Sequence, residues 1–143
     1  MNIEEFFLKS VGEWSSMRSV HSLAFKEFEE IRSRIRIIPA KKNDCRVIKL
    51  VKDSLVTTNE ETKAFLIHWE AKSEWSEESQ KENLSGESIL VPIEVSKTEG
   101  KIVRSVGYAE AIQVISLYKL LDDGTIIINS NYKHISTEER IWF

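Results

Sequence analysis

The chain has 143 residues, of which 41% are hydrophobic, a size and content that suit one domain built around one core. Its 20 basic and 23 acidic residues give a net charge of −3, which argues against general nucleic-acid binding because that function usually requires a basic excess. No apolar run approaches the length of a membrane span, and the first residues have neither the basic start nor the apolar stretch of a secretory signal.

The N-terminal residues predict a short helix followed by two strands. Asn2 and Glu5 have the spacing of a capping box, and Gly12 ends the helical segment. Residues 15–25 are rich in small, β-branched and aromatic types, which favour a strand. Between Ile31 and Ile37 every second residue is an arginine, so this strand should have one apolar face and one wet face.

A break from Pro39 to Asp44 separates these strands from a second short helix. From Asp44 to Lys52 the apolar residues are three and four apart, which is the spacing of one helix face. A strand can show the same short apolar run, so that alternative stays open. We expect this helix to cover the strands of the domain as a lid or to pack on their flank.

The second half of the chain predicts consecutive strands with no helix between them. Residues 76–85 form a polar loop, and Gly124 supplies the positive φ angle of a hairpin turn. The expected strands cover residues 62–75, 88–94, 102–106, 112–121, 125–134 and 138–143. Such a series favours antiparallel up-and-down pairing, and about eight to ten strands can close into a β-barrel with room for one small ligand.

No catalytic motif is evident in the sequence. The three histidines (His21, His68 and His134) are scattered, so we expect no metal site. The single cysteine, Cys45, excludes an internal disulfide bond and favours a reducing, intracellular compartment. Its neighbour Arg46 is compatible with an activated thiolate, but we favour an inert, half-buried cysteine.

Two tryptophans are spaced so that a strand would place them on one face. Trp69 and Trp75 alternate with Ala71 and Ser73 on that face, and small residues between two indoles leave a gap for a flat conjugated ligand. The alternative is ordinary barrel core, because tryptophan is mostly buried in any protein.

Arginines on the first and last strands provide positive charge. Arg18 shares a strand face with Trp14, and on the last strand Arg140 shares a face with Glu138 and Trp142. Because a closed barrel brings its first and last strands together, we expect Arg18 and Arg140 to approach one cavity. Two guanidiniums there would suit a ligand with two carboxylates. The alternative for each arginine is a salt bridge to a nearby glutamate, for which Glu138 is available.

Several blocks of the sequence resemble a known family. Gly12-Glu13-Trp14 resembles the Gly-x-Trp signature of lipocalins, in which an arginine near the last strand packs over the tryptophan. Arg140 has the corresponding place, which gives it a structural role that competes with ligand binding. The wider pattern resembles the S-type phycobiliprotein lyases (the CpcS/CpeS family) in six blocks that occur in the family's order. These blocks are Asn2-Ile3-Glu4-Glu5-Phe6-Phe7, Gly12-x-Trp14-x3-Arg18-x2-His21, Trp69-x5-Trp75, Leu90-Val91-Pro92, Gly107-Tyr108-Ala109-Glu110 and Glu138-Glu139-Arg140-Ile141-Trp142-Phe143.

The resemblance implies a single lipocalin-like, bilin-binding barrel over residues 1–143, with a short N-terminal helix and one additional short helix. It implies a lyase that binds phycoerythrobilin or phycocyanobilin as its substrate, with no prosthetic group. The lyase would attach this open-chain tetrapyrrole by a thioether bond to a cysteine of a phycoerythrin or phycocyanin α or β subunit. A cyanobacterial cytoplasm or a plastid stroma would fit, and a homodimer is conceivable.

The resemblance also assigns roles to individual residues. Arg18 is expected to bind a propionate, Trp69 and Trp75 to form the stacking surface, and His21 to donate a proton as the catalytic residue. The positions expected to line or support the bilin pocket further include Tyr132, Glu138, Arg140 and Trp142, and Trp14 is expected to be structural.

Near Tyr132 the chain departs from the family pattern, with Asn131 and Lys133 where acidic residues are expected. This departure raises the questions of which bilin is used and whether transfer is retained. The alternatives are a bilin carrier without transfer activity and a lipocalin-like barrel for fatty acids.

Overall fold

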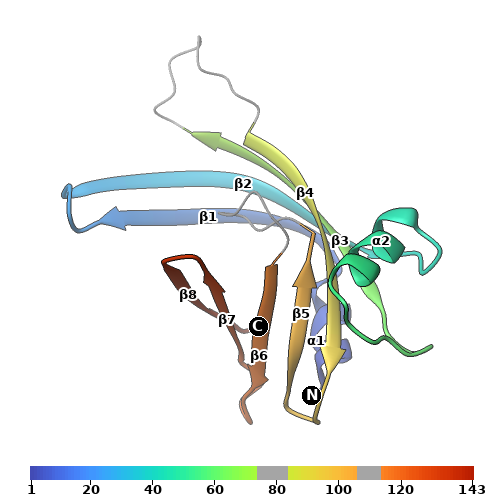
Figure 1. The fold of residues 1–143 in the computed structure, drawn as a ribbon. Coiled ribbons are helices and arrows are strands. Elements are labelled where there is room, and N and C mark those ends of the chain that lie inside the picture. The colour runs from blue at the N-terminus through green and yellow to red at the C-terminus, as the bar shows by residue number, and fades with distance from the viewer. Residues whose placement is uncertain (74–83, 106–113) are drawn as a thin grey trace.

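The computed structural model describes residues 1–73, 84–105 and 114–143. Eight strands form one antiparallel sheet in which every strand pairs with its neighbour in sequence (Figure 1). The strands are β1 (Gly12–Ser22), β2 (Glu27–Ala40), β3 (Ala64–Ser73), β4 (Leu84–Glu94), β5 (Glu99–Arg104), β6 (Val114–Leu120), β7 (Ile126–Tyr132) and β8 (Ile135–Ile141). The predicted up-and-down topology is confirmed, and the fold is of the lipocalin-like type.

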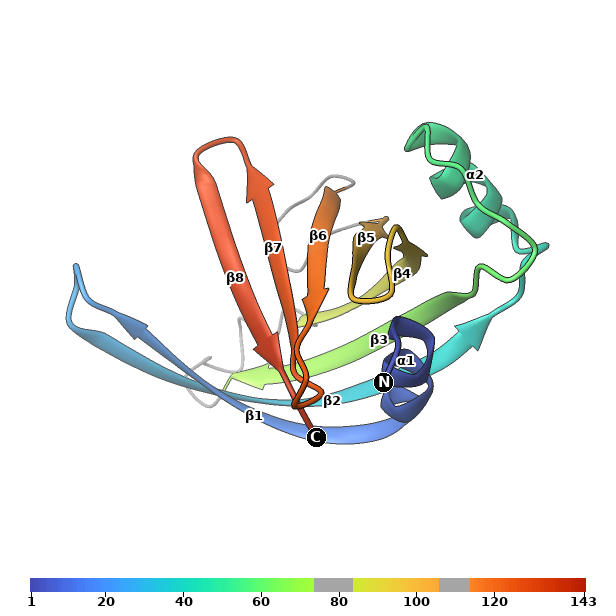
Figure 2. The same cartoon turned by 90° about the horizontal axis from the view of Figure 1, so that it is seen from below.

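The sheet curls into a barrel that is open along one seam. Figure 2 shows β1, β2 and β3 along one side, with β6, β7 and β8 rising opposite them. Each described strand is hydrogen-bonded only to its sequence neighbours, so no backbone ladder joins β1 to β8. Full closure was therefore a wrong expectation, because side chains of β1 and β8 face each other across the cavity instead of their backbones pairing.

Helix α1 (Ile3–Ser10) closes one end of the barrel. The predicted capping box is confirmed, since Asn2 Oδ1 accepts from the Glu5 amide at 2.8 Å and the Glu5 carboxylate accepts from the Asn2 amide at 2.9 Å. Phe6 and Phe7 are buried in the barrel core, and the Phe7 ring stacks on Phe65 with 5.0 Å between centroids. This end of the barrel is consequently filled with aromatic side chains.

Helix α2 (Cys45–Asp53) packs on the outer face of the sheet. Asp44 caps it by accepting from the Arg46 amide at 2.9 Å. Val47 and Leu50 are buried against four residues on the outer face of β3, β4 and β5. These residues are Ala64, Ile89, Val91 and Val103. The predicted helix is thus confirmed as a flank of the barrel. Neither described helix is long and apolar enough to cross a membrane.

Strand β2 runs further than the sequence predicted, because it continues through Pro39 to Ala40. Strand β1 ends its pairing with β2 at Ile37, so beyond that residue β2 is hydrogen-bonded only to β3, where Pro39 lies opposite Phe65. A residue without an N–H is tolerated where one side of a strand is unpaired. The break therefore begins after Ala40 instead of at Pro39.

Candidate functional site

A cavity of about 460 Å³ lies inside the barrel. This volume falls within the range of about 300–1,000 Å³ that is typical of small-molecule sites. Most of its wall is apolar, and the isoleucines that line it are Ile31, Ile35, Ile37, Ile67, Ile102, Ile128 and Ile141. The aromatic and charged groups of the wall are Trp69, Arg18, Arg104 and Glu139, together with Phe6 and Phe7 from the closed end.

The alternation predicted for the second strand, β2, determines which of its side chains line the cavity. Ile31, Ser33, Ile35 and Ile37 line the cavity, whereas the intervening arginines are exposed on the outer face. This prediction is confirmed. A period of two places the guanidiniums of Arg32, Arg34 and Arg36 in solvent and the side chains of Ile31, Ile35 and Ile37 inside.

The structure brings Arg18 and Trp69 together in the same cavity. Arg18 lies on β1 opposite Ile31, and Trp69 lies on β3 opposite Ile35 of β2 and Gly86 of β4. Both side chains line the cavity. Trp75, which was expected to share the face of Trp69, lies outside the described residues.

The last strand presents to the cavity the face opposite to the expected one. Glu139 and Ile141 line the cavity, so Glu138 and Arg140 lie on the outer face. There Arg140 Nε donates to Glu138 Oε1 at 2.9 Å, and both side chains are at least half exposed. The expected approach of Arg18 and Arg140 to one cavity is therefore wrong, and the alternative of a salt bridge to Glu138 is observed. Trp142 follows the strand and is 68% exposed.

The second guanidinium of the cavity belongs to Arg104, which sequence reasoning missed. Its Nη2 donates to Ser116 Oγ at 3.1 Å and to Ser130 Oγ at 2.7 Å, and its Nη1 lies 3.8 Å from Glu139 Oε2. A signal was present in the sequence, because alternation along a strand places Arg104 on the same face as the buried Ile102. Arginine is seldom placed on a core face, so this alternation was not followed to Arg104.

Two more predicted residues lie away from the cavity wall. His21 is exposed near the end of β1, where its ring lies 4.8 Å from that of Phe28. The β1–β2 register has no bulge to turn His21 inward, so it stays on the face opposite to Arg18. Tyr132 ends β7 on the face of Ser130 and is half-buried, with the Lys133 amine 5.3 Å from its ring centroid.

Trp14 joins the N-terminal helix to the C-terminal end of the chain. Its Nε1 donates to the Ser10 carbonyl at 2.8 Å, and its ring lies 6.1 Å from that of Phe143. The side chain is 42% exposed, so Trp14 is not fully buried. These contacts support its expected structural role.

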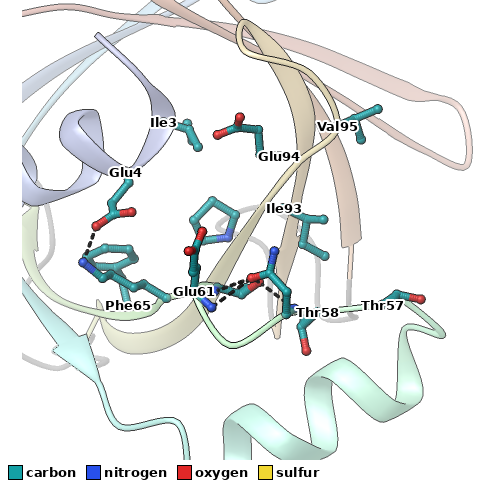
Figure 3. A pocket seen from close by; sticks show the side chains of 13 residues that line it. Ile3, Glu4, Thr57, Thr58, Glu61, Phe65, Ile93, Glu94 and Val95 are labelled. Carbon is teal, nitrogen blue, oxygen red and sulfur yellow. Dashed lines mark hydrogen bonds and ion pairs between the residues drawn. The ribbon is translucent and has the colours of Figure 1, made fainter.

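A second pocket, of about 390 Å³, lies beside the closed end, between α1, residues 57–63 and the end of β4 (Figure 3). Three carboxylates line it, those of Glu4, Glu61 and Glu94, and Lys63 forms an ion pair with Glu4. No tryptophan or arginine is part of its wall among the described residues. These carboxylates would repel an anion, whereas the barrel cavity combines two guanidiniums with an indole inside an apolar wall, so we take the barrel cavity as the candidate site.

The chain is similar to several proteins of known family and to a solved structure. The family model described as CpeS-like protein matches residues 2–143. The chain is 39% identical to chromophore lyase CpcS/CpeS 3 of Trichodesmium erythraeum, over 100% of this chain and 82% of the relative. It is 34% identical to chromophore lyase CpcS/CpeS of Thermosynechococcus vestitus, over 100% of this chain and 78% of the relative. Among solved structures, the S-type phycobiliprotein lyase CPES from Guillardia theta matches with a TM-score of 0.85 and 30% identity, over 100% of this chain and 76% of that one.

Proposed function

We propose, from the premise that this chain belongs to the CpeS-like protein family, that it is a bilin lyase. In this proposal the barrel binds an open-chain tetrapyrrole and attaches it by a thioether bond to a cysteine of a phycobiliprotein subunit. Residues 1–143 act as one bilin-binding unit.

The observation that carries the proposal is the composition of the cavity wall. An open-chain tetrapyrrole is conjugated and apolar along its length and bears two propionate arms. The cavity offers the indole of Trp69 and a set of isoleucines for the conjugated part, and the guanidinium of Arg18 for a propionate. A fatty-acid carrier would need one cation and an aliphatic interior, so the indole and the further cation Arg104 favour the tetrapyrrole.

The chemistry asks little of the lyase beyond binding and orientation. The acceptor thiolate adds to the exocyclic carbon of the ethylidene double bond on ring A, and the proton ends on the ring carbon of the same double bond, so no oxidant or reductant is consumed. The nucleophile comes from the acceptor protein, and the barrel holds the pigment in one conformation and limits side reactions with water.

One carboxylate among the described wall residues suits the pyrrole nitrogens. Glu139 lines the cavity, and an ionised carboxylate accepts hydrogen bonds from N–H donors. His21, the expected proton donor, is exposed on the other face of β1. We therefore propose Glu139 as the ionisable group that contacts the pigment inside the cavity.

The pigment is phycoerythrobilin or phycocyanobilin. One relative of the chain is named a putative phycoerythrobilin lyase, and another is named a phycocyanobilin lyase subunit. The acceptor is an α or β subunit of phycoerythrin or phycocyanin type. The protein would then act where such subunits are assembled, in a cyanobacterial cytoplasm or a plastid stroma.

Two measurements test the function in order. Mixing the protein with phycocyanobilin or phycoerythrobilin should give a shifted and structured visible absorption band, whereas a fatty-acid barrel would leave the pigment spectrum unchanged. Adding an acceptor subunit should then produce covalent pigment on the denatured acceptor, detected by zinc-induced fluorescence. Binding without covalent pigment above the uncatalysed control would reduce the protein to a bilin carrier.

A further inference from the structure

The wall of the barrel cavity contains a polar cluster that the sequence did not reveal. Arg104 of β5, Ser116 of β6 and Ser130 of β7 lie side by side on the inner face of three consecutive strands. The two serines are 0% and 2% exposed, and their hydroxyl oxygens lie 2.6 Å apart. They hold one edge of the Arg104 guanidinium, whose side chain is 15% exposed.

The positive charge of this guanidinium is poorly compensated. Among the residues that the structure describes, its partners at hydrogen-bond distance are two neutral hydroxyls, and the carboxylate of Glu139 lies 3.8 Å away. Charge-assisted hydrogen bonds between a guanidinium and a carboxylate are usually about 2.7–2.9 Å long. The buried Nε of Arg104 has no hydrogen-bond partner within the described parts of the chain. A half-satisfied buried cation costs free energy that an incoming anion would recover.

Other arginines of the same molecule show that this arrangement is unusual for it. Arg46 pairs with Asp44 at 3.0 Å and Arg140 pairs with Glu138 at 2.9 Å, both on the exposed outer surface. These arginines form short ion pairs in solvent, where such pairs contribute little to stability. Arg104, for which a carboxylate partner would matter most, has within the described part of the chain only the 3.8 Å contact to the Glu139 carboxylate.

We propose that Arg104, oriented by Ser116 and Ser130, is a carboxylate-binding subsite of the cavity. The proposal deepens the proposed function, on which the identity of its ligand depends: Arg104 takes one propionate arm of the pigment and Arg18 takes the other. The two arginines come from β5 and β1, so the arms are held by different walls of the cavity. The carboxylate accepts a hydrogen bond from Nη1, the terminal nitrogen that the two serine hydroxyls do not engage.

The test compares a pigment with its own ester. Phycocyanobilin and its dimethyl ester are titrated into the wild-type protein and into the variants Arg104→Gln, Arg104→Lys and Arg140→Gln, with binding followed by visible absorbance. Loss of a charge-assisted interaction should weaken binding of the free acid to Arg104→Gln by about ten- to a hundredfold. Binding of the ester should change little, and Arg104→Lys should lie between the two. Arg140→Gln, the matched control on the outer face, should behave as the wild type does.

The subsite is overturned if Arg104→Gln binds acid and ester with the same ratio as the wild-type protein. It is also overturned if both forms weaken equally in both Arg104 variants, because that result assigns the arginine to the fold. Failure of the wild-type protein to bind either form would contradict the proposed function instead. The subsite is then tested with the monocarboxylate probe cis-parinaric acid and its methyl ester, for which Arg104→Gln should lose the preference for the acid.

Discussion

The indole of Trp69 lies directly against the backbone of Gly86, its partner across the β3–β4 register. A Cβ atom built on Gly86 would lie 2.4 Å from Cζ2 and 2.8 Å from Cε2 of the indole. The absence of a side chain at residue 86 thus fixes how closely Trp69 can approach β4. The position of the Trp69 indole in the cavity wall therefore depends on Gly86, although Gly86 has no side chain that could contact a ligand.

Substitution of Gly86 by alanine should displace the indole. Because the ring is rigid and its neighbours are packed, we expect the free energy of unfolding to fall by about 1–3 kcal/mol, together with a shift in tryptophan fluorescence and weaker pigment binding. Thermal unfolding and pigment titration measure these effects. The double variant Gly86→Ala/Trp69→Leu should regain stability, since the clash is removed, but not pigment affinity. A Gly86→Ala protein as stable as the wild type would refute the close contact.

Removal of Arg18 should affect binding more than stability. Arg18 lines the cavity, so Arg18→Ala is expected to weaken binding of the free-acid pigment by about tenfold or more while the melting temperature stays nearly unchanged. Arg34→Ala is the matched control, because Arg34 is exposed on the outer face of the neighbouring strand β2. Intact binding with a large loss of melting temperature would assign Arg18 to the fold.

Trp14 should contribute less to stability than a core tryptophan. Full burial of this residue type predicts a cost of about 3–5 kcal/mol for replacement by alanine, but its 42% exposure reduces the expected cost of Trp14→Ala to about 2 kcal/mol. Trp14→Phe keeps the contact with Phe143 and loses the hydrogen bond to Ser10, so it should cost about 1 kcal/mol. Denaturant unfolding of both variants measures the two terms. Equal costs for the two variants would contradict this division.

Tyr118 should make stability fall at alkaline pH. Burial, with a smaller contribution from the charge of Glu94, raises the pKa of the Tyr118 phenol from 10.0 to about 12. The folded state therefore retains the proton over a range in which the unfolded state loses it, so the contribution of Tyr118 is complete below pH 10 and is lost as pH rises toward 12.

The variant Tyr118→Phe isolates this effect. The buried hydroxyl has no hydrogen-bond partner within residues that the structure describes, so its removal should change stability little at pH 7 or increase it slightly. Above pH 10 the difference between variant and wild-type unfolding free energies should move in favour of the variant. A constant difference from pH 8 to 11.5, measured by denaturant unfolding, would show that the phenol ionises equally in both states.

Several elements of the fold could be predicted because their local patterns follow directly from backbone geometry. Asn2 and Glu5 satisfy the amides at the start of α1, and the alternation from Ile31 to Ile37 separates a wet face from a dry one. The up-and-down topology then followed from tight turns between consecutive strands. None of these inferences required knowledge of contacts between distant strands.

The cavity wall was harder to predict because it depends on which face of a strand turns inward. The last strand was divided correctly into two faces, but Ile141 and Trp142 are both large and apolar, so the sequence could not decide which one is inside. Placing Trp142 on the inner face also placed Arg140 there, because the two residues share a face. For the same reason Glu139 was assigned to the outer face. Arg104 was missed for the related reason that its supporting hydroxyls, on Ser116 and Ser130, belong to two other strands.

The gap between β1 and β8 means that the barrel diameter is not fixed by backbone pairing between its first and last strands. In a fully closed barrel, any increase in diameter must stretch or break a ladder of backbone hydrogen bonds. Here no such ladder joins β1 to β8 among the described strands, so backbone hydrogen bonds between these two strands do not fix the diameter. The cavity can then accept a flexible ligand in differently curved conformations. The seven antiparallel strand pairings that hold the sheet together stay intact.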